Sequence, residues 1–185
     1  MNVYDFDGTI YKGDSTWDFY FWCLRRNPSF VRFLPRQGVA AAGYLLKQYD
    51  KTRMKEQFYC FLPHVVPISE QVQLFWKSHE QNLYPWYLSQ KQPDDIIISA
   101  SPQFLLAPVC EKLGIRLIAS RVDPSTGEYT GKNCHGEEKV QRFHQEFPSA
   151  VPDCFYSDSL SDLPMAKISK SAFFVSGHSP KPWIL

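Results

Sequence analysis

Positions 3–9 read Val-Tyr-Asp-Phe-Asp-Gly-Thr, a short apolar strand that runs into two acidic residues and a glycine. Side chains alternate along a strand, so Asp5 and Asp7 are expected on the same side, and Gly8 permits a sharp turn away from it. In open α/β sheets, ligands bind at the carboxyl ends of the strands. A strand followed by an ordinary Asx turn would explain the same residues, so the interpretation depends on the rest of the chain.

Further apolar runs have the character of buried strands. They are short, rich in β-branched or aromatic residues and largely free of alternation, which is typical of strands covered on both faces. The stretches 103–113 and 137–147 between them have helical patterns. Alternating strands and helices predict a Rossmann-like α/β fold, a parallel sheet with helices on both faces. The strand-like runs are Ile96 to Ile98, Ile115 to Ala119, Cys154 to Tyr156 and Ala172 to Val175.

Residues 12–92 have a different texture. Helical segments are expected from Trp17 and over 36–48, 53–62 and 69–83, with prolines between them. Ser15 and Thr16 are expected to cap the first of these helices. We therefore predict an α/β core made of residues 1–11 and 93–185, and an inserted all-helical cap over 12–92. The turn-rich stretch 122–130 predicts a small hairpin.

Composition restricts the class of protein. The chain has 185 residues, 44% of them hydrophobic and 21% charged, as expected of a globular protein. A formal net charge of +1 gives no reason to expect a nucleic-acid partner. Five scattered cysteines suit a reducing cytoplasm better than a disulfide framework. The sequence has no signal-peptide pattern and no apolar run of membrane-spanning length, so we expect a cytoplasmic protein that contacts a membrane at most peripherally.

Two further segments supply candidates for binding a phosphoryl group. Ser99 ends the second apolar run and could donate a hydrogen bond to a phosphoryl oxygen, although Ser101 is a rival for this role. Lys139 opens a predicted helix, where a lysine usually faces solvent; a phosphate-transfer site, however, needs a cation to balance its acids. The adjacent Cys134 and His135 are poor evidence for zinc because no second pair accompanies them.

The fourth segment is Tyr-Ser-Asp-Ser-Leu-Ser-Asp at positions 156–162, after another apolar run. Asp158 follows the strand end, and Asp162 lies four residues on, within reach of the same loop. An N-cap followed by an acidic helix start would account for both residues. The order of the four segments favours the functional interpretation, since each one follows a predicted strand.

Taken together, DFDGT, IIIS, the Lys139 segment and YSDSLSD resemble the four motifs of the haloacid dehalogenase superfamily. The resemblance is greatest to its phosphoserine-phosphatase-like branch, in which a helical cap follows the first strand, and it extends over residues 5–162. Stretches 11–16, 99–102 and 133–140 are also similar to that branch. One departure is Ser157, where the branch more often has glycine; serine there resembles the bacterial phosphatidylglycerophosphate phosphatases.

This resemblance implies a magnesium-dependent phosphatase. Asp5 would be the nucleophile that becomes an aspartyl-phosphate, and Asp7 the general acid and base. The resemblance assigns Mg²⁺ to Asp5, the Asp7 carbonyl and Asp158, with Asp162 in support. It further implies that Ser99 and Lys139 bind the phosphoryl group. At the turn after the first strand, Gly8 and Thr9 are expected beside the phosphate.

The substrate is expected to be a small phosphorylated metabolite, such as a phosphoserine-like compound. A phosphatidylglycerophosphate-type lipid phosphate, or transfer to an acceptor other than water, are the alternatives, and a non-catalytic binding module is a third class that the intact acidic pairs disfavour. The stretch 25–55 contains eight basic residues and a single acidic one, Asp50. They are either a solvated helix face or a surface that attracts an anionic substrate or an anionic membrane.

Overall fold

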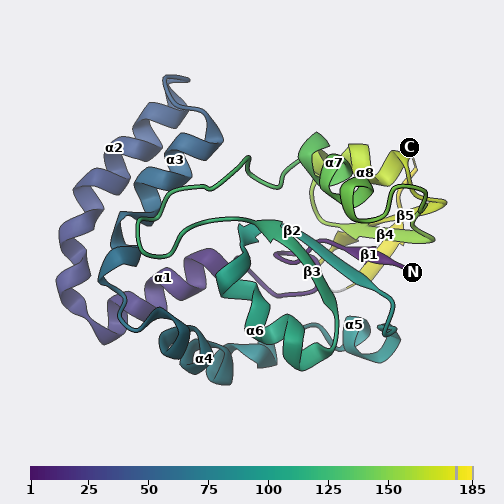
Figure 1. Cartoon of the computed structure of the whole chain (residues 1–185), viewed down its shortest axis with the longest axis horizontal. Helices are drawn as coiled ribbons and strands as arrows, with labels where there is room; N and C mark the ends of the chain where they lie inside the picture. The colour runs from purple at the N-terminus through teal and green to yellow at the C-terminus, as the bar shows by residue number, and fades with distance from the viewer. Residues whose placement is uncertain (178, 185) are drawn as a thin grey trace.

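The computed structural model describes residues 1–177 and 179–184, and a six-stranded sheet lies at its centre (Figure 1). The strand order is β3-β2-β1-β4-β5-β6; the first five strands are parallel, and β6 pairs antiparallel with β5. The carboxyl ends of β1, β2 and β4 therefore meet at one edge. The strands are β1 Val3–Tyr4, β2 Ile96–Pro102, β3 Arg116–Ser120, β4 Cys154–Ser157, β5 Ser171–Ser176 and β6 Ser179–Pro182.

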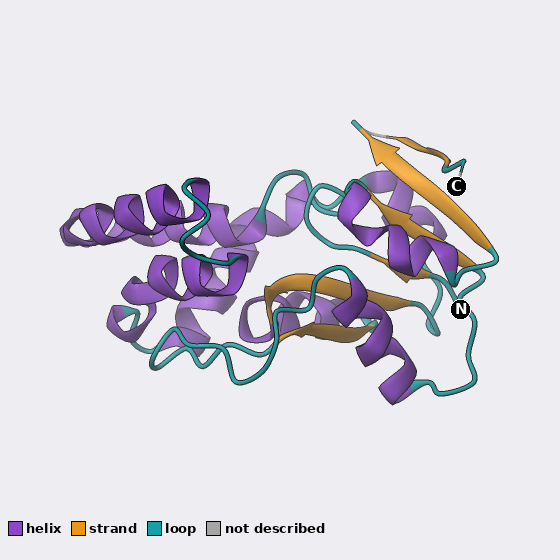
Figure 2. Cartoon of the chain, turned by 90° about the horizontal axis from the view of Figure 1, so that it is seen from above, coloured by secondary structure: helices purple, strands orange, loops and turns teal. Residues whose placement is uncertain are grey.

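Helices cover both faces of this sheet, as predicted (Figure 2). Tyr4 and Ile97 belong to one hydrophobic core, which they share with α4 (Ile68–His79), α5 (Pro85–Gln90) and α6 (Gln103–Leu113). The alternate side chains of Val3, Ile96 and Ile98 belong to a second core, shared with α7 (Glu137–Glu146) and α8 (Leu163–Lys167). The strands are thus buried on both sides, which explains why they read as continuous apolar runs.

The chain between β1 and β2 is helical. It contains α1 (Ser15–Arg26), α2 (Leu34–Leu45) and α3 (Lys51–Phe58) before α4 and α5, and three 3₁₀ helices at Pro28–Phe33, Tyr59–His64 and Glu80–Asn82. The expected cap of the first helix was wrong: Asp14 Oδ1 accepts the N–H groups of Thr16 and Trp17, and Ser15 already lies in the first turn. An acid at this position also complements the helix dipole.

The helices of this insert divide into two groups. The α2–α3 hairpin projects away from the sheet, whereas α4 and α5 lie along one face of it (Figure 1). Trp76 Nε1 of α4 donates to the Leu105 carbonyl of α6 at 2.6 Å. Tyr87 of α5 is fully buried, with its ring 5.0 Å from that of Tyr4. We therefore propose that, within the predicted cap of 12–92, α1 to α3 are the part that acts as a cap.

The long segment between β3 and α7 reaches back to this hairpin. Its predicted hairpin at 122–130 is reduced to a single bridge between Val122 and Tyr129 around a turn. The backbone N–H of Tyr129 donates to Glu56 Oε1 at 3.1 Å. Gly127 packs on the backbone of Tyr59 so closely that an added Cβ would lie 2.7 Å from its carbonyl oxygen. This segment therefore links the core to α3.

Candidate active site

The turn after β1 brings two acidic segments together. Asp5 continues the sheet, because its N–H donates to the Tyr156 carbonyl of β4 at 2.9 Å. The chain then turns at Gly8, whose φ is +69°. A Cβ at this glycine would lie 2.0 Å from Asp158 Oδ2. Only glycine therefore permits both the turn and the approach of the Asp158 carboxylate to the β1 loop.

Thr9 fixes the second acidic segment from the same turn. Its hydroxyl accepts the Asp158 N–H at 3.0 Å and donates to Asp158 Oδ1 at 3.4 Å, and the residue is fully buried. Gly8, Thr9 and Asp158 lie beside the cavity described below and are not among its lining residues. Thr9 thus positions Asp158, which is 149 residues away in the sequence.

Lys139 lies between two acids in the interior. Its Nζ is 2.9 Å from Asp5 Oδ1 and 2.7 Å from Asp162 Oδ2, and the residue is 1% exposed. Asp162 Oδ2 also accepts a hydrogen bond from Ser157 Oγ at 2.8 Å. Burial raises the pKa of Asp5 to about 7, although the charge of Lys139 lowers it. A lysine at a helix start usually faces solvent, but Lys139 here forms ion pairs with two buried carboxylates, Asp5 and Asp162.

Asp7 lies where the core meets the insert. Its Oδ1 accepts the Ser15 N–H of α1 at 2.6 Å, and its Oδ2 accepts from Ser101 Oγ at 2.5 Å. Burial, and then the charge of Asp14, raise the pKa of Asp7 to about 6 despite these hydrogen bonds. A carboxyl with such a pKa can hold or release a proton near neutral pH.

The two serines at the end of β2 have different partners. Ser101 Oγ donates to Asp7 and lies 3.2 Å from Thr16 Oγ1 of α1. Ser99 Oγ accepts the Ser101 N–H at 3.1 Å. Since accepting a hydrogen bond does not use the hydroxyl hydrogen of Ser99, that hydrogen remains available to donate.

A cavity of about 220 Å³ opens on these groups from between the sheet edge and the insert. On the core side Asp5, Asp7, Ser99 and Lys139 line it, as do Ser101 and Asp162. The opposite wall comes from α1 and α3. Its apolar lining residues are Trp17, Met54, Phe58 and the ring of Tyr59, and its polar ones are Asp14, Thr16, Lys51 and Lys55; Ala100, His135, Ser159 and Ser161 complete the lining.

Lys51 and Lys55 were recognised in the sequence only as members of a basic run. In the structure Lys55 Nζ donates to the Ala100 carbonyl at 3.0 Å. No acidic partner within ion-pair distance is recorded for either lysine among the described residues. Burial, followed by the charge of Lys51, lowers the pKa of Lys55 to about 8. Their spacing of one helical turn was the available signal, because it places both on one face of α3.

The oxygen atoms at this edge suit a hard cation. Asp162 Oδ1 is buried without a hydrogen-bond partner in the described structure, and burial raises the pKa of both Asp5 and Asp7. Both features indicate negative charge that the protein alone balances poorly. Within residues 1–177 and 179–184, no three acidic, histidine or cysteine side chains form a metal-binding group. A site made of two carboxylates and a backbone carbonyl has only two such side chains. Its three oxygen atoms are nevertheless a donor set that fits Mg²⁺.

The family model of the haloacid dehalogenase-like hydrolases matches residues 3–167, which include all four segments. The chain belongs to this family. Over 80 residues it is 35% identical to a probable phosphatase of Mycobacterium tuberculosis, an alignment that covers 39% of this chain and 28% of that relative. The chain thus spans little more than a quarter of that relative's length.

Two solved structures share the fold of this haloacid dehalogenase-like hydrolase. A protein of unknown function from Bordetella pertussis superposes with a TM-score of 0.71 at 22% identity, covering 93% of this chain and 87% of that one. A probable phosphoserine phosphatase from Vibrio cholerae superposes with a TM-score of 0.64 at 10% identity, covering 92% and 55%. The expected α/β fold with a helical insert after the first strand is confirmed.

Proposed function

We propose that this haloacid dehalogenase-like hydrolase is a phosphatase that cleaves phosphate monoesters through an aspartyl-phosphate on Asp5. The observation that carries the proposal is the position of Asp5 at the end of the central strand, open to the cavity and 2.9 Å from the buried ammonium group of Lys139. A buried carboxylate beside a cation and a hydroxyl is a suitable nucleophile for phosphoryl transfer.

The residues of the cavity can divide the reaction into two steps. In the first, an Asp5 oxygen attacks phosphorus, the ester P–O bond breaks, and Asp7 gives its proton to the leaving oxygen. In the second, Asp7 takes a proton from water as the water oxygen attacks phosphorus, and inorganic phosphate leaves Asp5. Ser99 and Lys139 would hold the phosphoryl oxygens. We assign this role to Ser99 over Ser101 because the Ser101 hydroxyl donates to Asp7.

We propose Mg²⁺ as the cofactor. The Asp5 carboxylate, the Asp7 carbonyl and the Asp158 carboxylate would hold it, and Asp162 would support the site through Lys139 and Ser157. When bound, the cation offsets the repulsion between the Asp5 carboxylate and the anionic phosphoryl group. The protein's own part is to keep these oxygen donors in place, which Gly8 and Thr9 do for Asp158.

The opposite wall of the cavity supports a substrate with two distinct parts. Lys51 and Lys55 supply two cations that no described acid contacts at ion-pair distance, so a second anionic group on the substrate could pair with them directly. Trp17, Met54 and Phe58 offer an apolar surface beside those lysines. A small phosphorylated metabolite with a carboxylate, as in a phosphoserine-like compound, supplies the second anionic group, and a phospholipid headgroup with a second phosphate is the alternative.

A screen of phosphorylated metabolites and lipid phosphates with the full chain, with and without Mg²⁺, tests this function. The expected result is release of free inorganic phosphate that requires Mg²⁺ and is fastest for substrates with a second anionic group. Phosphate that appears on an added alcohol instead of in solution would identify a phosphotransferase. Absence of turnover with every phosphate ester, with the fold intact, would refute the proposal.

The surroundings in which the protein acts are also part of the proposal. All five cysteines lie in the described residues and are free, which supports a reducing cytoplasm. We propose no nucleic-acid partner, because a net charge of +1 gives no general attraction to nucleic acid. Among the described helices, none has the length and apolar character that crossing a membrane requires.

A further inference from the structure

Helix α2 has its apolar side on the outside. Gln37, Ala40 and Gly43 are buried, and their spacing of three residues defines the face that packs on the rest of the insert. At 100° per residue, the opposite side consists of the residues farthest from these three. It is formed by Leu34, Pro35, Gly38, Val39, Ala41, Ala42, Leu45 and the following Leu46, none of which has a polar side chain. We call these eight residues the outer face of α2.

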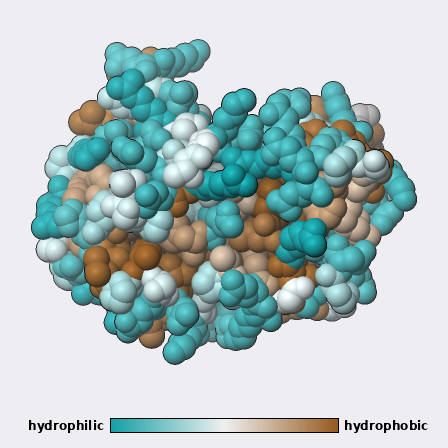
Figure 3. Space-filling model, in the orientation of Figure 1, coloured by the Kyte–Doolittle hydropathy of each residue, from teal (hydrophilic) through white to brown (hydrophobic). Residues whose placement is uncertain are grey.

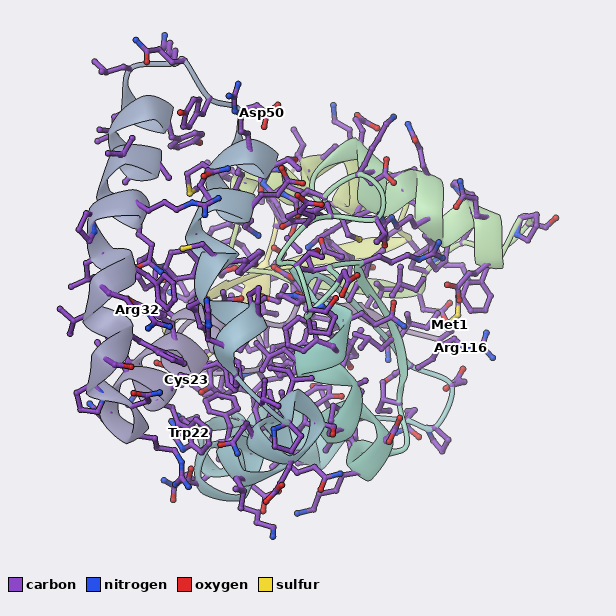
Figure 4. The ribbon with its side chains drawn as sticks, turned by 60° about the vertical axis from the view of Figure 1, so that its left-hand side comes forward. Met1, Trp22, Cys23, Arg32, Asp50 and Arg116 are labelled. Atoms are coloured by element: carbon purple, nitrogen blue, oxygen red, sulfur yellow. The ribbon has the colours of Figure 1, made fainter. Side chains whose placement is uncertain are left out.

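This outer face is open to solvent. Val39 is 64% exposed, Leu45 80% and Leu46 69%. Figure 4 shows side chains on this side of α2 pointing away from the protein, with no other ribbon beside them. In Figure 3, brown and tan hydrophobic residues lie among teal ones on the left-hand side, where Figure 1 has α2. A surface helix normally directs its apolar side inward, so this arrangement leaves an apolar stripe without a partner.

Basic residues lie at both ends of the stripe. Arg32 precedes α2, and Lys47 and Arg53 follow at its far end, where Asp50 is the acid of the turn. Arg36 lies on the opposite side of α2 from the stripe, where its Nε donates a hydrogen bond to Gln57 Oε1 of α3 at 2.9 Å. All four basic residues are exposed. Arg32 and Arg53 lie over the rings of Phe33 and Tyr49, without an acidic partner in the described structure. The surface is therefore apolar in the middle and positive at its two ends.

We propose that the outer face of α2, with Arg32, Lys47 and Arg53, docks the protein on the surface of an anionic lipid membrane. An apolar stripe flanked by cations is the pattern of a helix that lies in the membrane interface. With 12 residues, α2 is about 18 Å long, too short to cross a hydrocarbon core of about 30 Å. Charge argues against a second copy of this chain, since a two-fold contact would oppose identical basic groups.

Flotation of the full chain with vesicles tests this surface without any measurement of activity. We expect binding to vesicles of phosphatidylcholine with phosphatidylglycerol, and much weaker binding to phosphatidylcholine alone. Val39→Glu/Leu45→Glu should reduce binding at least about tenfold, the equivalent of about 1.4 kcal/mol. The matched control is Val151→Glu/Ile184→Glu, which places the same charges on exposed apolar residues elsewhere, and it should bind as the wild type does.

A second pair of variants tests the charged part. Arg32→Gln/Lys47→Gln should lower binding at low salt and remove most of its salt dependence. Circular dichroism and thermal unfolding should be unchanged in all these variants because the substituted side chains are exposed. Wild-type protein that does not float with anionic vesicles would overturn the proposal. So would a dimer in sedimentation experiments that Val39→Glu/Leu45→Glu abolishes, since the second copy would then be the occupant.

Discussion

Replacing Lys139 by Met tests the buried charge network at the centre of the site. Met keeps an unbranched apolar side chain and removes the ammonium group that lies 2.9 Å from Asp5 and 2.7 Å from Asp162. Two carboxylates would then share a site in which the lysine and Asp162 side chains are only 2% exposed. Removing one partner of a buried ion pair costs about 3–5 kcal/mol, because the remaining charge is uncompensated.

The size of this loss can be compared directly with that of an exposed ion pair. For a chain of this length, about 1 kcal/mol corresponds to about 2–4 °C in Tm, so we expect Lys139→Met to lower Tm by about 6–20 °C. Lys170→Met is the matched control. Lys170 lies 2.7 Å from Asp153, but the two side chains are 64% and 49% exposed, so solvent screening should leave Tm almost unchanged.

The loss should depend on pH in a defined direction. Burial raises the pKa of Asp5 from its usual 3.8 to about 7 even with Lys139 present, and removing that cation raises it further. A carboxyl whose pKa is higher in the folded chain than in the unfolded chain lowers stability as pH rises between those two values. The difference in free energy of unfolding between Lys139→Met and wild type should therefore be larger at pH 8 than at pH 5.

Urea unfolding in EDTA, followed by circular dichroism at both pH values, measures these differences without a contribution from bound metal. The double variant Lys139→Met/Asp162→Asn should recover part of the lost stability, because one uncompensated charge is removed with the lysine. If Lys139→Met unfolds at the same urea concentration as Lys170→Met at pH 8, the buried network does not have the energetic role that its geometry indicates.

Three further predictions concern catalysis. Asp7→Asn should lower kcat for alkyl phosphates by about 10²–10⁴ and far less for aryl phosphates, whose leaving groups need little protonation; equal losses would remove Asp7 as the general acid. EDTA should stop phosphate release, and Mg²⁺ should restore it more fully than Zn²⁺; one tightly bound zinc per chain that depends on Cys134 would contradict this. Lys51→Gln/Lys55→Gln should raise KM by about tenfold or more for a substrate with a second anionic group, since 1.4 kcal/mol is a factor of ten, and little for an aryl phosphate. Arg53→Gln is the control, because Arg53 is on the same helix and is exposed. Equal effects of the two variants would mean that the lysines act only through the general positive charge of the surface.

The sequence predicted the sheet well because its central strands are buried on both faces. Ile96 to Ile98 alternate between two cores, so neither face needed a polar residue, and the run stood out. Helix α6 follows a clear apolar period and has the predicted bounds, 103–113. Strand β6 was missed because Ser179–Pro182 contains two prolines; its position at the edge of the sheet tolerates them.

The other differences arise from contacts between distant segments. Helix α5 was not predicted because Pro85 looked like a break, although proline is favoured in the first turn of a helix. Helix periodicity could show that Lys51 and Lys55 share a face, but only the packing of α3 against the sheet edge shows that this face lines the cavity. Likewise, the apolar residues of α2 have the spacing of an ordinary buried helix face. Only the structure shows that the opposite side of α2 packs on the insert and leaves these residues exposed.

Detection of a phosphoryl group on Asp5 tests the central proposal most directly. Enzyme mixed with a reactive aryl phosphate and Mg²⁺, quenched in acid and digested, would be analysed by mass spectrometry. The expected result is a peptide containing Asp5 that carries the added mass of one HPO₃ group. Asp5→Asn should show neither this peptide nor turnover, and its circular dichroism should match the wild type. Turnover by Asp5→Asn within about tenfold of the wild type, or the phosphoryl group on another residue, would contradict the assignment of Asp5 as the nucleophile.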